Sequence, residues 1–120
     1  MKNERDEFMN ELSAASQRII AVLSKVPHGK VASYGQIAAL ADVPLGARSV
    51  VRVLHSCSDK YALPWHRILR SNGEIALGED AGRTKQKVMM QEEGVKFISE
   101  FRVDMTVSAW NPMEDPLTWT

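Results

Sequence analysis

The sequence predicts a mainly α-helical protein with a small β-wing, that is, a winged helix-turn-helix domain. Two short segments with helical apolar spacing, 34–41 and 47–57, are joined by a tight turn around Pro44 and Gly46. An Asn-Gly pair at 72–73 lies between apolar residues, which predicts a hairpin suited to a wing. A helical hairpin of another kind would give a similar periodicity, so the pattern alone leaves that alternative open.

One long helix is expected at the N-terminus. It should cover residues 5–25 and end at the breakers Pro27 and Gly29. Residues 30–33 are short and apolar, and they can form either a strand or an extended linker. The apolar residues that recur at helical spacing and should face the core are Phe8, Leu12, Ala15, Ile19, Leu23 and Val26.

The two central helices have the clearest boundary signals. Ser33 followed three residues later by Gln36 matches a capping box, so the first of them should begin at Tyr34. The second is expected over residues 47–57. The side chains expected to face inward are Ile37, Leu40 and Ala41 in the first helix, and Val50, Val53 and Leu54 in the second.

The sequence of the C-terminal part predicts a hairpin, a last helix and one or two short strands. The hairpin strands would be Ile68–Leu69 and Ile75–Leu77, and the strands after the helix would lie within 96–110. The last helix, over 82–95, should turn Val88 and Met89 inward and end at Gly94. We expect one domain over residues 1–112 and a C-terminal tail over residues 113–120.

Length and composition exclude several protein classes. A chain of 120 residues, 44% hydrophobic and 25% charged, fits one small globular domain. It has no apolar run long enough to span a membrane and no apolar signal core at its charged N-terminus, so we expect a cytoplasmic protein. The single cysteine, Cys57, and three scattered histidines predict no disulfide, no metal site and no other cofactor.

Charge is unevenly distributed along this neutral chain. Residues 25–70 carry seven basic and two acidic side chains, whereas residues 71–120 carry five basic and nine acidic ones. A basic region on a neutral protein fits a polyanionic partner such as nucleic acid. Segregation along the chain need not survive folding, so the charge pattern alone does not decide the partner.

Several motifs together resemble one known family. They are "VPHGKVASYGQIAALADVPLGARSVVRVL", "PWHRIL", "SNG" and "EEGV", and the resemblance runs from about Ile19 to Pro112. This combination is similar to the DNA-binding domain of O6-alkylguanine-DNA alkyltransferases. It resembles more closely the alkyltransferase-like proteins, which have tryptophan in place of the acceptor cysteine and many of which end in an aromatic-x-proline motif like "SAWNP". The resemblance implies a winged helix-turn-helix domain of the alkyltransferase type.

The residue between the proline and the histidine of "PWHR" decides which activity the resemblance implies. In the enzymes it is a cysteine that accepts the alkyl group, and this chemistry needs a thiolate. Here it is Trp65, whose indole nitrogen is a donor only. The resemblance therefore implies a protein without enzymatic activity that binds O6-alkylguanine in duplex DNA and flips it into a pocket. A tryptophan that only fills the core is the alternative.

The family also implies partners for such a protein. They are double-stranded DNA containing O6-alkylguanine and the proteins of nucleotide-excision repair, to which the bound lesion would be flagged. The protein would be a monomer, associated with the nucleoid in a bacterium or located in the nucleus of a eukaryote.

The resemblance implies roles for individual residues. Tyr34 would press on the phosphate 3′ to the target, and Arg48 would enter the stack that the base has left. Small residues beside Arg48 would let the helix approach the minor groove. Outside this context, Tyr34 would be an ordinary half-buried tyrosine and Arg48 a solvated charge. The implied residues are Ser33, Tyr34, Gln36, Ala47, Arg48, Ser49 and Arg52 for DNA binding, Tyr34, Pro64 and Trp65 for the lesion pocket, and His66, Arg67 and Glu93 for a structural network.

The chain also departs from the family pattern. Cys57 stands where the family has an asparagine that braces the turn after the second helix, so Ser56 or Ser58 would have to replace that brace. Val51 replaces a usual glycine and would limit how closely the helix approaches the groove. The loop that lines the lesion pocket in alkyltransferase-like proteins is acidic here up to Arg83, and whether Arg83 reaches the pocket stays open.

Two other functions remain possible from the sequence. One is an active DNA alkyltransferase that uses Cys57, although the predicted end of a helix is a poor place to stabilise a thiolate. The other is a transcription regulator with a winged helix-turn-helix, which would need a dimer or a further domain.

Overall fold

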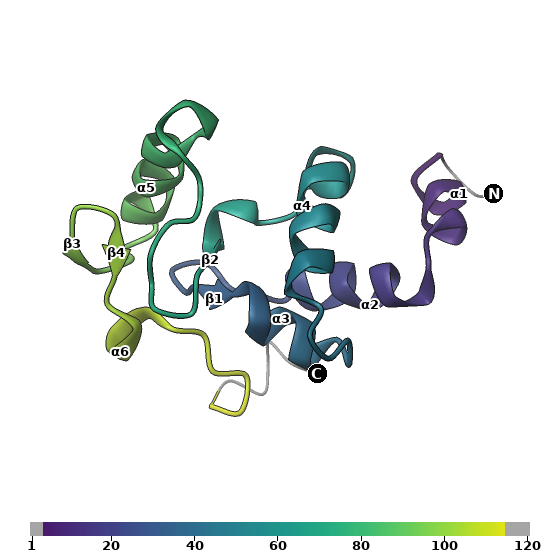
Figure 1. The fold of residues 1–120 in the computed structure, drawn as a ribbon, viewed down its shortest axis with the longest axis horizontal. Helices are drawn as coiled ribbons and strands as arrows, with labels where there is room; N and C mark the ends of the chain where they lie inside the picture. Colours follow the sequence, from purple (N-terminus) through teal and green to yellow (C-terminus); the bar gives the residue numbers. More distant parts are fainter. Residues whose placement is uncertain (1–3, 115–120) are drawn as a thin grey trace.

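Helices make up most of the chain, and two small sheets lie among them. A computed structural model describes residues 4–114, with side chains from residue 7 onward. Figure 1 shows α2, α3 and α4 on one side of the molecule, α5, β3 and β4 on the other, and β1 and β2 between them. The elements are α1 (Glu4–Glu11), α2 (Ala14–Leu23), β1 (Ala32–Ser33), α3 (Tyr34–Leu40), α4 (Ala47–Tyr61), the 3₁₀ helix η1 (Trp65–Arg67), β2 (Ile68–Leu69), the 3₁₀ helix η2 (Glu79–Ala81), α5 (Arg83–Glu92), β3 (Phe97–Ser99), β4 (Arg102–Val103) and α6 (Met105–Ser108).

The N-terminal part forms two helices, so the prediction of one continuous helix over residues 5–25 is wrong. The helix is interrupted at residues 12–13. α1 ends at Glu11, and α2 begins at Ala14. The Ser13 hydroxyl accepts a hydrogen bond from the Ser16 N–H at 3.1 Å and so caps a new helix start, where sequence periodicity predicted continuation. Of the expected core face, Ile19, Leu23 and Val26 are buried, and Phe8, Leu12 and Ala15 are partly buried.

α3 and α4 form the expected helix-turn-helix. The Ser33 hydroxyl accepts a hydrogen bond from the Gln36 N–H at 3.0 Å, so the predicted start of α3 at Tyr34 is confirmed. The reciprocal half of a capping box does not form, because the Gln36 side-chain amide donates to the backbone carbonyl of Trp110 at 2.9 Å. This hydrogen bond ties the segment after α6 to the start of α3.

α4 is one turn longer than predicted. It continues past residue 57 to Tyr61 and ends at Ala62, which adopts the left-handed conformation with φ of 51°. Cys57 therefore lies inside the helix and not at its end. The turn before α4 requires Gly46, because a Cβ there would lie 2.5 Å from the carbonyl oxygen of Val43. The expected inward residues Ile37, Ala41, Val50 and Val53 are buried, and Leu40 and Leu54 are partly buried.

The wing is built differently from the predicted hairpin. The turn at Asn72-Gly73 is present, and Gly73 has φ of +89° and donates its N–H to the Arg70 carbonyl at 2.8 Å. However, β2 pairs with β1 in parallel, and residues 75–77 form no strand. The chain after the turn instead pairs with β4 and the residue before it, since the Ile75 N–H donates to the Phe101 carbonyl at 3.0 Å.

The C-terminal part matches the prediction in its elements but not in its buried face. α5 presents Gln86 and Met90 to the interior, whereas Val88 is 44% exposed, so the expected inward position of Val88 is wrong. Gly94 follows the helix with φ of +87°, as predicted. The expected strands are β3 and β4, and the short helix α6 was not predicted. Most of the expected tail, residues 115–120, lies outside the described residues.

Two apolar clusters form the core, and β1 and β2 separate them. Ala32 and Ile68 belong to the cluster beneath α2, α3 and α4, whereas Val31 and Leu69 belong to the cluster beneath α5 and β4. Neighbouring residues thus point to opposite sides, as the alternation of extended backbone requires. None of the helices within residues 4–114 is long and apolar enough to cross a bilayer.

Candidate functional site

A cavity of about 330 Å³ opens between α4, η1 and the segment before α5. Its volume is at the lower end of the range for small-ligand sites in proteins. The start of α3 and the middle of α5 complete the wall. The residues that line it are Tyr34, Val51, Leu54, His55, Ser58, Asp59, Trp65, Ile68, Leu77, Ala81 and Gln86.

Trp65 divides this cavity from a second hollow. The indole is half-buried, lies edge-on to the His66 ring with centroids 6.1 Å apart, and lines both spaces. Pro64 lines only the second hollow, on the other side of the indole. The structure thus brings Tyr34 and Trp65 together in one cavity but does not bring Pro64 with them, because the chain turns sharply into η1 at Pro64.

Tyr34 is the first residue of α3 and faces the same cavity. Burial raises the pKa of the Tyr34 hydroxyl, although the nearby Arg70 guanidinium opposes this effect. The phenol therefore stays neutral and can both donate and accept a hydrogen bond. Trp65, which carries an indole N–H, and His55 also line the cavity, so polar groups stand beside its apolar walls.

Gln86 was not predicted as part of any site. Its side chain is 1% exposed, and its amide nitrogen donates to the backbone carbonyls of His66 and Ile68 at 3.2 and 2.9 Å. These two hydrogen bonds fix the orientation of the amide. Its oxygen Oε1 has no hydrogen-bond partner among the described residues, although buried acceptors are normally paired. Gln86 lies one helical turn before the buried Met90, but the sequence predicted Val88 and Met89 on the inner face and so gave no signal for either residue.

His66, Arg67 and Glu93, which the resemblance implies for a structural network, lie in contact with one another. Nε2 of His66 lies 2.7 Å from Oε2 of Glu93, and the Arg67 guanidinium donates to both carboxylate oxygens. The Gly29 N–H adds a hydrogen bond at 3.0 Å that was not predicted. Arg67 also donates to the Val26 carbonyl at 2.9 Å, so the network joins η1, the end of α5 and the loop before β1.

The carboxylate of Glu93 is held ionised by this network. Burial alone would raise the pKa of Glu93, but the hydrogen bonds from Arg67, Gly29 and His66 outweigh it and lower the pKa to about 2. An ionised carboxylate that already accepts hydrogen bonds from three residues has little capacity left for chemistry. Its geometry suits a structural role.

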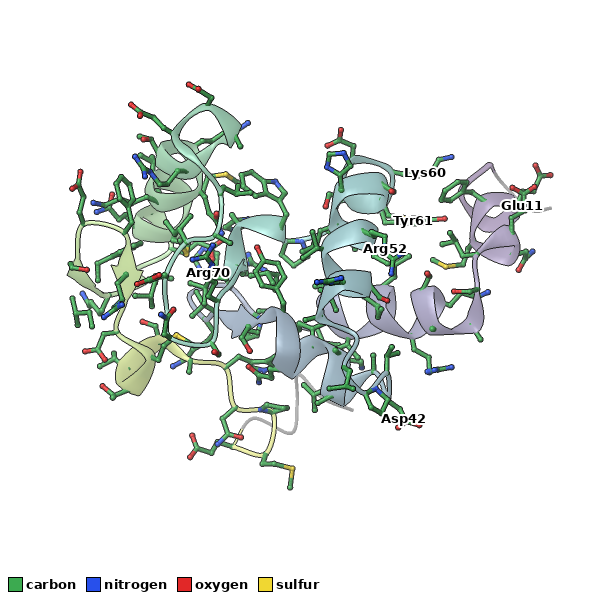
Figure 2. The ribbon with its side chains drawn as sticks, viewed as in Figure 1. Glu11, Asp42, Arg52, Lys60, Tyr61 and Arg70 are labelled. Carbon is green, nitrogen blue, oxygen red and sulfur yellow. The ribbon has the colours of Figure 1, made fainter. Side chains whose placement is uncertain are left out.

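The residues implied for DNA binding occupy different surroundings. Arg48 is exposed on the first turn of α4 and makes no hydrogen bond or ion pair within the described part of the chain. Arg52 projects from α4 toward α1, as Figure 2 shows, and its guanidinium donates to the Ser49 hydroxyl at 3.4 Å. Another arginine, Arg70, lies near β2 (Figure 2). Ala47 and Ser49 are half-buried beside Arg48. Ser33 and Gln36 are engaged in the cap of α3 and the hydrogen bond to Trp110.

Cys57 lies on the opposite side of α4 from the cavity. It is 2% exposed and borders a separate hollow near Leu12 and Arg52. Burial raises the pKa of the Cys57 thiol, although Lys60 opposes the effect, so the thiol is a poor nucleophile there. Ser58 does not replace the missing brace between elements, since its hydroxyl donates to the Leu54 carbonyl of its own helix.

Arg83 does not reach the cavity. Its guanidinium lies over the Phe101 ring at 4.1 Å from the ring centroid, and it borders a hollow beside β4. No group of three or more potential metal ligands was found among residues whose placement is described.

Comparison with known proteins identifies the family. The sequence model of the 6-O-methylguanine DNA methyltransferase DNA-binding domain matches residues 14–95. The chain belongs to this family. Its fold class, the winged helix-turn-helix of the alkyltransferase type, and its resemblance to alkyltransferase-like proteins are therefore confirmed.

Relatives within this family include proteins named for recognition of DNA. A DNA base-flipping protein of Vibrio parahaemolyticus is 36% identical over 96 residues, which cover 79% of this chain and 94% of the relative. Alkyltransferase-like protein 1 of Schizosaccharomyces pombe is 30% identical over 100 residues, which cover 79% of this chain and 93% of the relative. The crystal structure of S. pombe Atl1 with damaged DNA containing O6-carboxymethylguanine superposes with a TM-score of 0.75 at 27% identity, covering 85% of this chain and 99% of that one.

Proposed function

We propose that this protein is a non-enzymatic sensor of O6-alkylguanine in duplex DNA. It flips the modified base into the cavity bordered by Tyr34 and Trp65 and flags it for nucleotide-excision repair. The observation that carries the proposal is that Trp65, which cannot accept an alkyl group, forms a wall of a base-sized cavity beside the helix-turn-helix. The base-flipping and damaged-DNA names of its relatives support the same function.

The absence of a usable nucleophile supports binding without alkyl transfer. No cysteine lines the cavity, and the Ser58 hydroxyl there donates to a backbone carbonyl. Cys57 is buried on the far side of α4 with a raised thiol pKa, which argues against an alkyltransferase that uses it. Incubation with DNA carrying a labelled O6-methyl group should leave the protein unlabelled, and labelled Cys57 would contradict this part of the proposal.

Base flipping needs groups that hold the duplex open, and the start of each central helix provides one. Arg48 fills the gap left by the extruded base and donates to the orphaned cytosine, which offsets part of the lost stacking energy. Tyr34 acts on the phosphate beside the target. Ala47 and Ser49 allow close approach of α4 to the minor groove, and Arg52 contacts phosphate. We propose that the protein acts as a monomer on chromosomal DNA, in the nucleoid of a bacterium or the nucleus of a eukaryote.

The deciding experiment is a fluorescence-anisotropy titration with one duplex, with and without a single O6-methylguanine, at fixed salt. The expected result is clearly tighter binding of the modified duplex. Equal affinity for both duplexes would contradict damage recognition. A strong preference among undamaged sequences would favour a transcription regulator.

Flagging for repair is tested separately. Incision of a plasmid with one O6-alkylguanine by purified excision-repair proteins should increase when the protein is added. If the protein binds the lesion but does not change incision, its proposed role as a damage sensor stands, and its proposed link to nucleotide-excision repair is contradicted.

A further inference from the structure

We infer that the cavity selects uncharged O6-alkyl adducts and discriminates against adducts that end in a carboxylate, and that Asp59 sets this selection. The inference rests on the proposed function and names the class of lesion that the site accepts. It follows from the charges around the cavity, which are unusual for a protein that binds a polyanion.

Asp59 is the one lining residue with a fixed charge. The other ten are apolar or neutral polar side chains, apart from the titratable His55 and the phenol of Tyr34, and none is lysine or arginine. Asp59 is exposed on the last turn of α4 and makes no ion pair or hydrogen bond within residues 7–114. Its charge is therefore not neutralised by the protein.

The cations that could neutralise Asp59 are held elsewhere. Lys60, the next residue, lies over the ring of Phe8 at 3.9 Å, and Figure 2 shows it on the side of α4 toward α1. Arg83 lies over the Phe101 ring. Arg70 lies 3.6 Å from the carboxylate of Glu74. Lys60 and Arg83 are thus engaged outside the cavity lining, and Arg70, which lies near Tyr34, shares its charge with Glu74.

The wall formed by the segment before α5 carries no lysine or arginine. Ala81 borders the cavity from η2, the other two residues of which are the exposed Glu79 and Asp80. Gln86 adds a buried carbonyl oxygen without a partner. The donor groups of the lining belong to Tyr34, Trp65 and His55, since the Ser58 hydroxyl donates to the Leu54 carbonyl. These can bind a neutral adduct, but they carry no fixed positive charge that would offset the repulsion between an adduct carboxylate and Asp59 at the solvated rim of the cavity.

The test compares two adducts of the same shape, O6-carboxymethylguanine and its neutral amide, O6-carbamoylmethylguanine, in the same duplex. The wild-type protein should bind the amide about threefold to tenfold more tightly than the acid, as expected for two charges several ångströms apart at a solvated rim. Asp59→Asn should bring this ratio close to one. Glu100→Gln, which removes an exposed carboxylate from the turn between β3 and β4, should leave the ratio unchanged.

The Glu100→Gln control separates selection from general electrostatics. Loss of any carboxylate strengthens binding to all DNA, but only a residue at the cavity changes the ratio between acid and amide. A wild-type protein that binds the acid as tightly as the amide, or a ratio that Asp59→Asn does not change, would overturn the inference. If neither O6-methylguanine nor the amide binds better than guanine, the proposed function itself fails.

Discussion

In the proposed function, Trp65 and Glu93 serve the binding of a modified base and not the transfer of its alkyl group. Trp65 supplies a rigid wall, and the network of His66, Arg67 and Glu93 has no thiol to activate. The network has a structural role. Its hydrogen bonds hold η1, and with it the Trp65 indole, against the end of α5 and the loop at Gly29. Rigid support of this kind is what a preformed binding pocket needs.

The network predicts a loss of stability in acid. The pKa of Glu93 is about 2 in the folded protein, against an ordinary value of 4.5. A lowered carboxyl pKa stabilises the fold fully above about pH 4.5, and this stabilisation, about 3 kcal/mol, is lost as the pH falls from 4.5 toward 2. Urea unfolding of wild type between pH 7 and pH 3 should show the decline.

Glu93→Gln should flatten that pH dependence. The variant should also be less stable at pH 7 by about 3 kcal/mol, because Arg67 then loses its charged partner in a mostly buried place. Glu100→Gln, at an exposed position, is the matched control and should change neither property. An unchanged acid slope in Glu93→Gln would contradict the assignment.

Arg48 gives the second prediction at this scale. Arg48→Ala should weaken binding to lesion DNA by about tenfold and binding to undamaged duplex by much less, because only the flipped state leaves a gap for the side chain to fill. Anisotropy titrations of both duplexes measure the difference, with Arg52→Ala as the control on the same helix. An equal loss on both duplexes, with a shallower salt dependence, would instead identify Arg48 as a phosphate contact.

At the scale of elements, the start of α3 links fold and site. The Ser33 hydroxyl caps the helix whose first residue is Tyr34, so the cap also positions a cavity residue. The α3–α4 turn is equally constrained, since Gly46 leaves no room for a Cβ and Arg18 donates to the Ala41 carbonyl at 2.8 Å. Local hydrogen bonds thus define where the two central helices begin.

Removal of the cap should cost both stability and binding. Ser33→Ala should lower the free energy of unfolding by about 1 kcal/mol and weaken lesion binding, because the N–H groups at the start of α3 lose their acceptor. Ser13→Ala removes the corresponding cap of α2 and serves as the control. It should cost similar stability in urea unfolding but leave lesion affinity unchanged. Similar binding losses in both variants would show that only global stability matters.

Signals carried by neighbouring residues explain what could be predicted. The Ser33 cap, the Gly94 stop and the Asn72-Gly73 turn lie within a few residues of what they determine, and each was predicted correctly. The parallel pairing of β1 with β2 joins residues 36 positions apart, and no local pattern specifies it. Gln86 was missed because a buried polar residue contradicts apolar periodicity, and only its two distant carbonyl acceptors justify its position. For the same reason Val88 was assigned to the wrong face.

At the scale of the whole molecule, folding disperses the basic middle of the chain. Arg67 is enclosed by the Glu93 network, Lys60 lies over Phe8, and Arg70 lies beside Glu74. Lys30 donates to the carbonyl of Val107. Four basic side chains of residues 25–70 are thus engaged within the protein. We therefore expect affinity for DNA to depend on few phosphate contacts.

This dispersal predicts a weak salt dependence. A plot of the logarithm of the association constant against the logarithm of salt concentration should have a slope of about −2 to −4, which corresponds to two to four phosphate contacts. Arg52→Ala should reduce the slope by about one on damaged and undamaged duplex alike. A slope steeper than about −6 would contradict this prediction, because it would require about seven phosphate contacts. Basic side chains that are engaged within the free protein would then have to contact phosphate in the complex.

The short β1–β2 pair has a consequence for how this chain can vary. Ala32 lies opposite Ile68 and Ser33 opposite Leu69, so two hydrogen-bonded steps set the spacing between Tyr34 and Trp65. A slip by one residue would move one strand by about 3.3 Å and turn its side chains to the opposite core cluster. The pair thus fixes the distance between the start of α3 and the cavity wall at Trp65, the two parts that the proposed function assigns to the DNA and to the flipped base. An insertion between residues 65 and 69 would therefore change the distance between Trp65 and Tyr34, whereas an insertion in a segment outside this span, such as that at residues 78–82, would leave the distance unchanged.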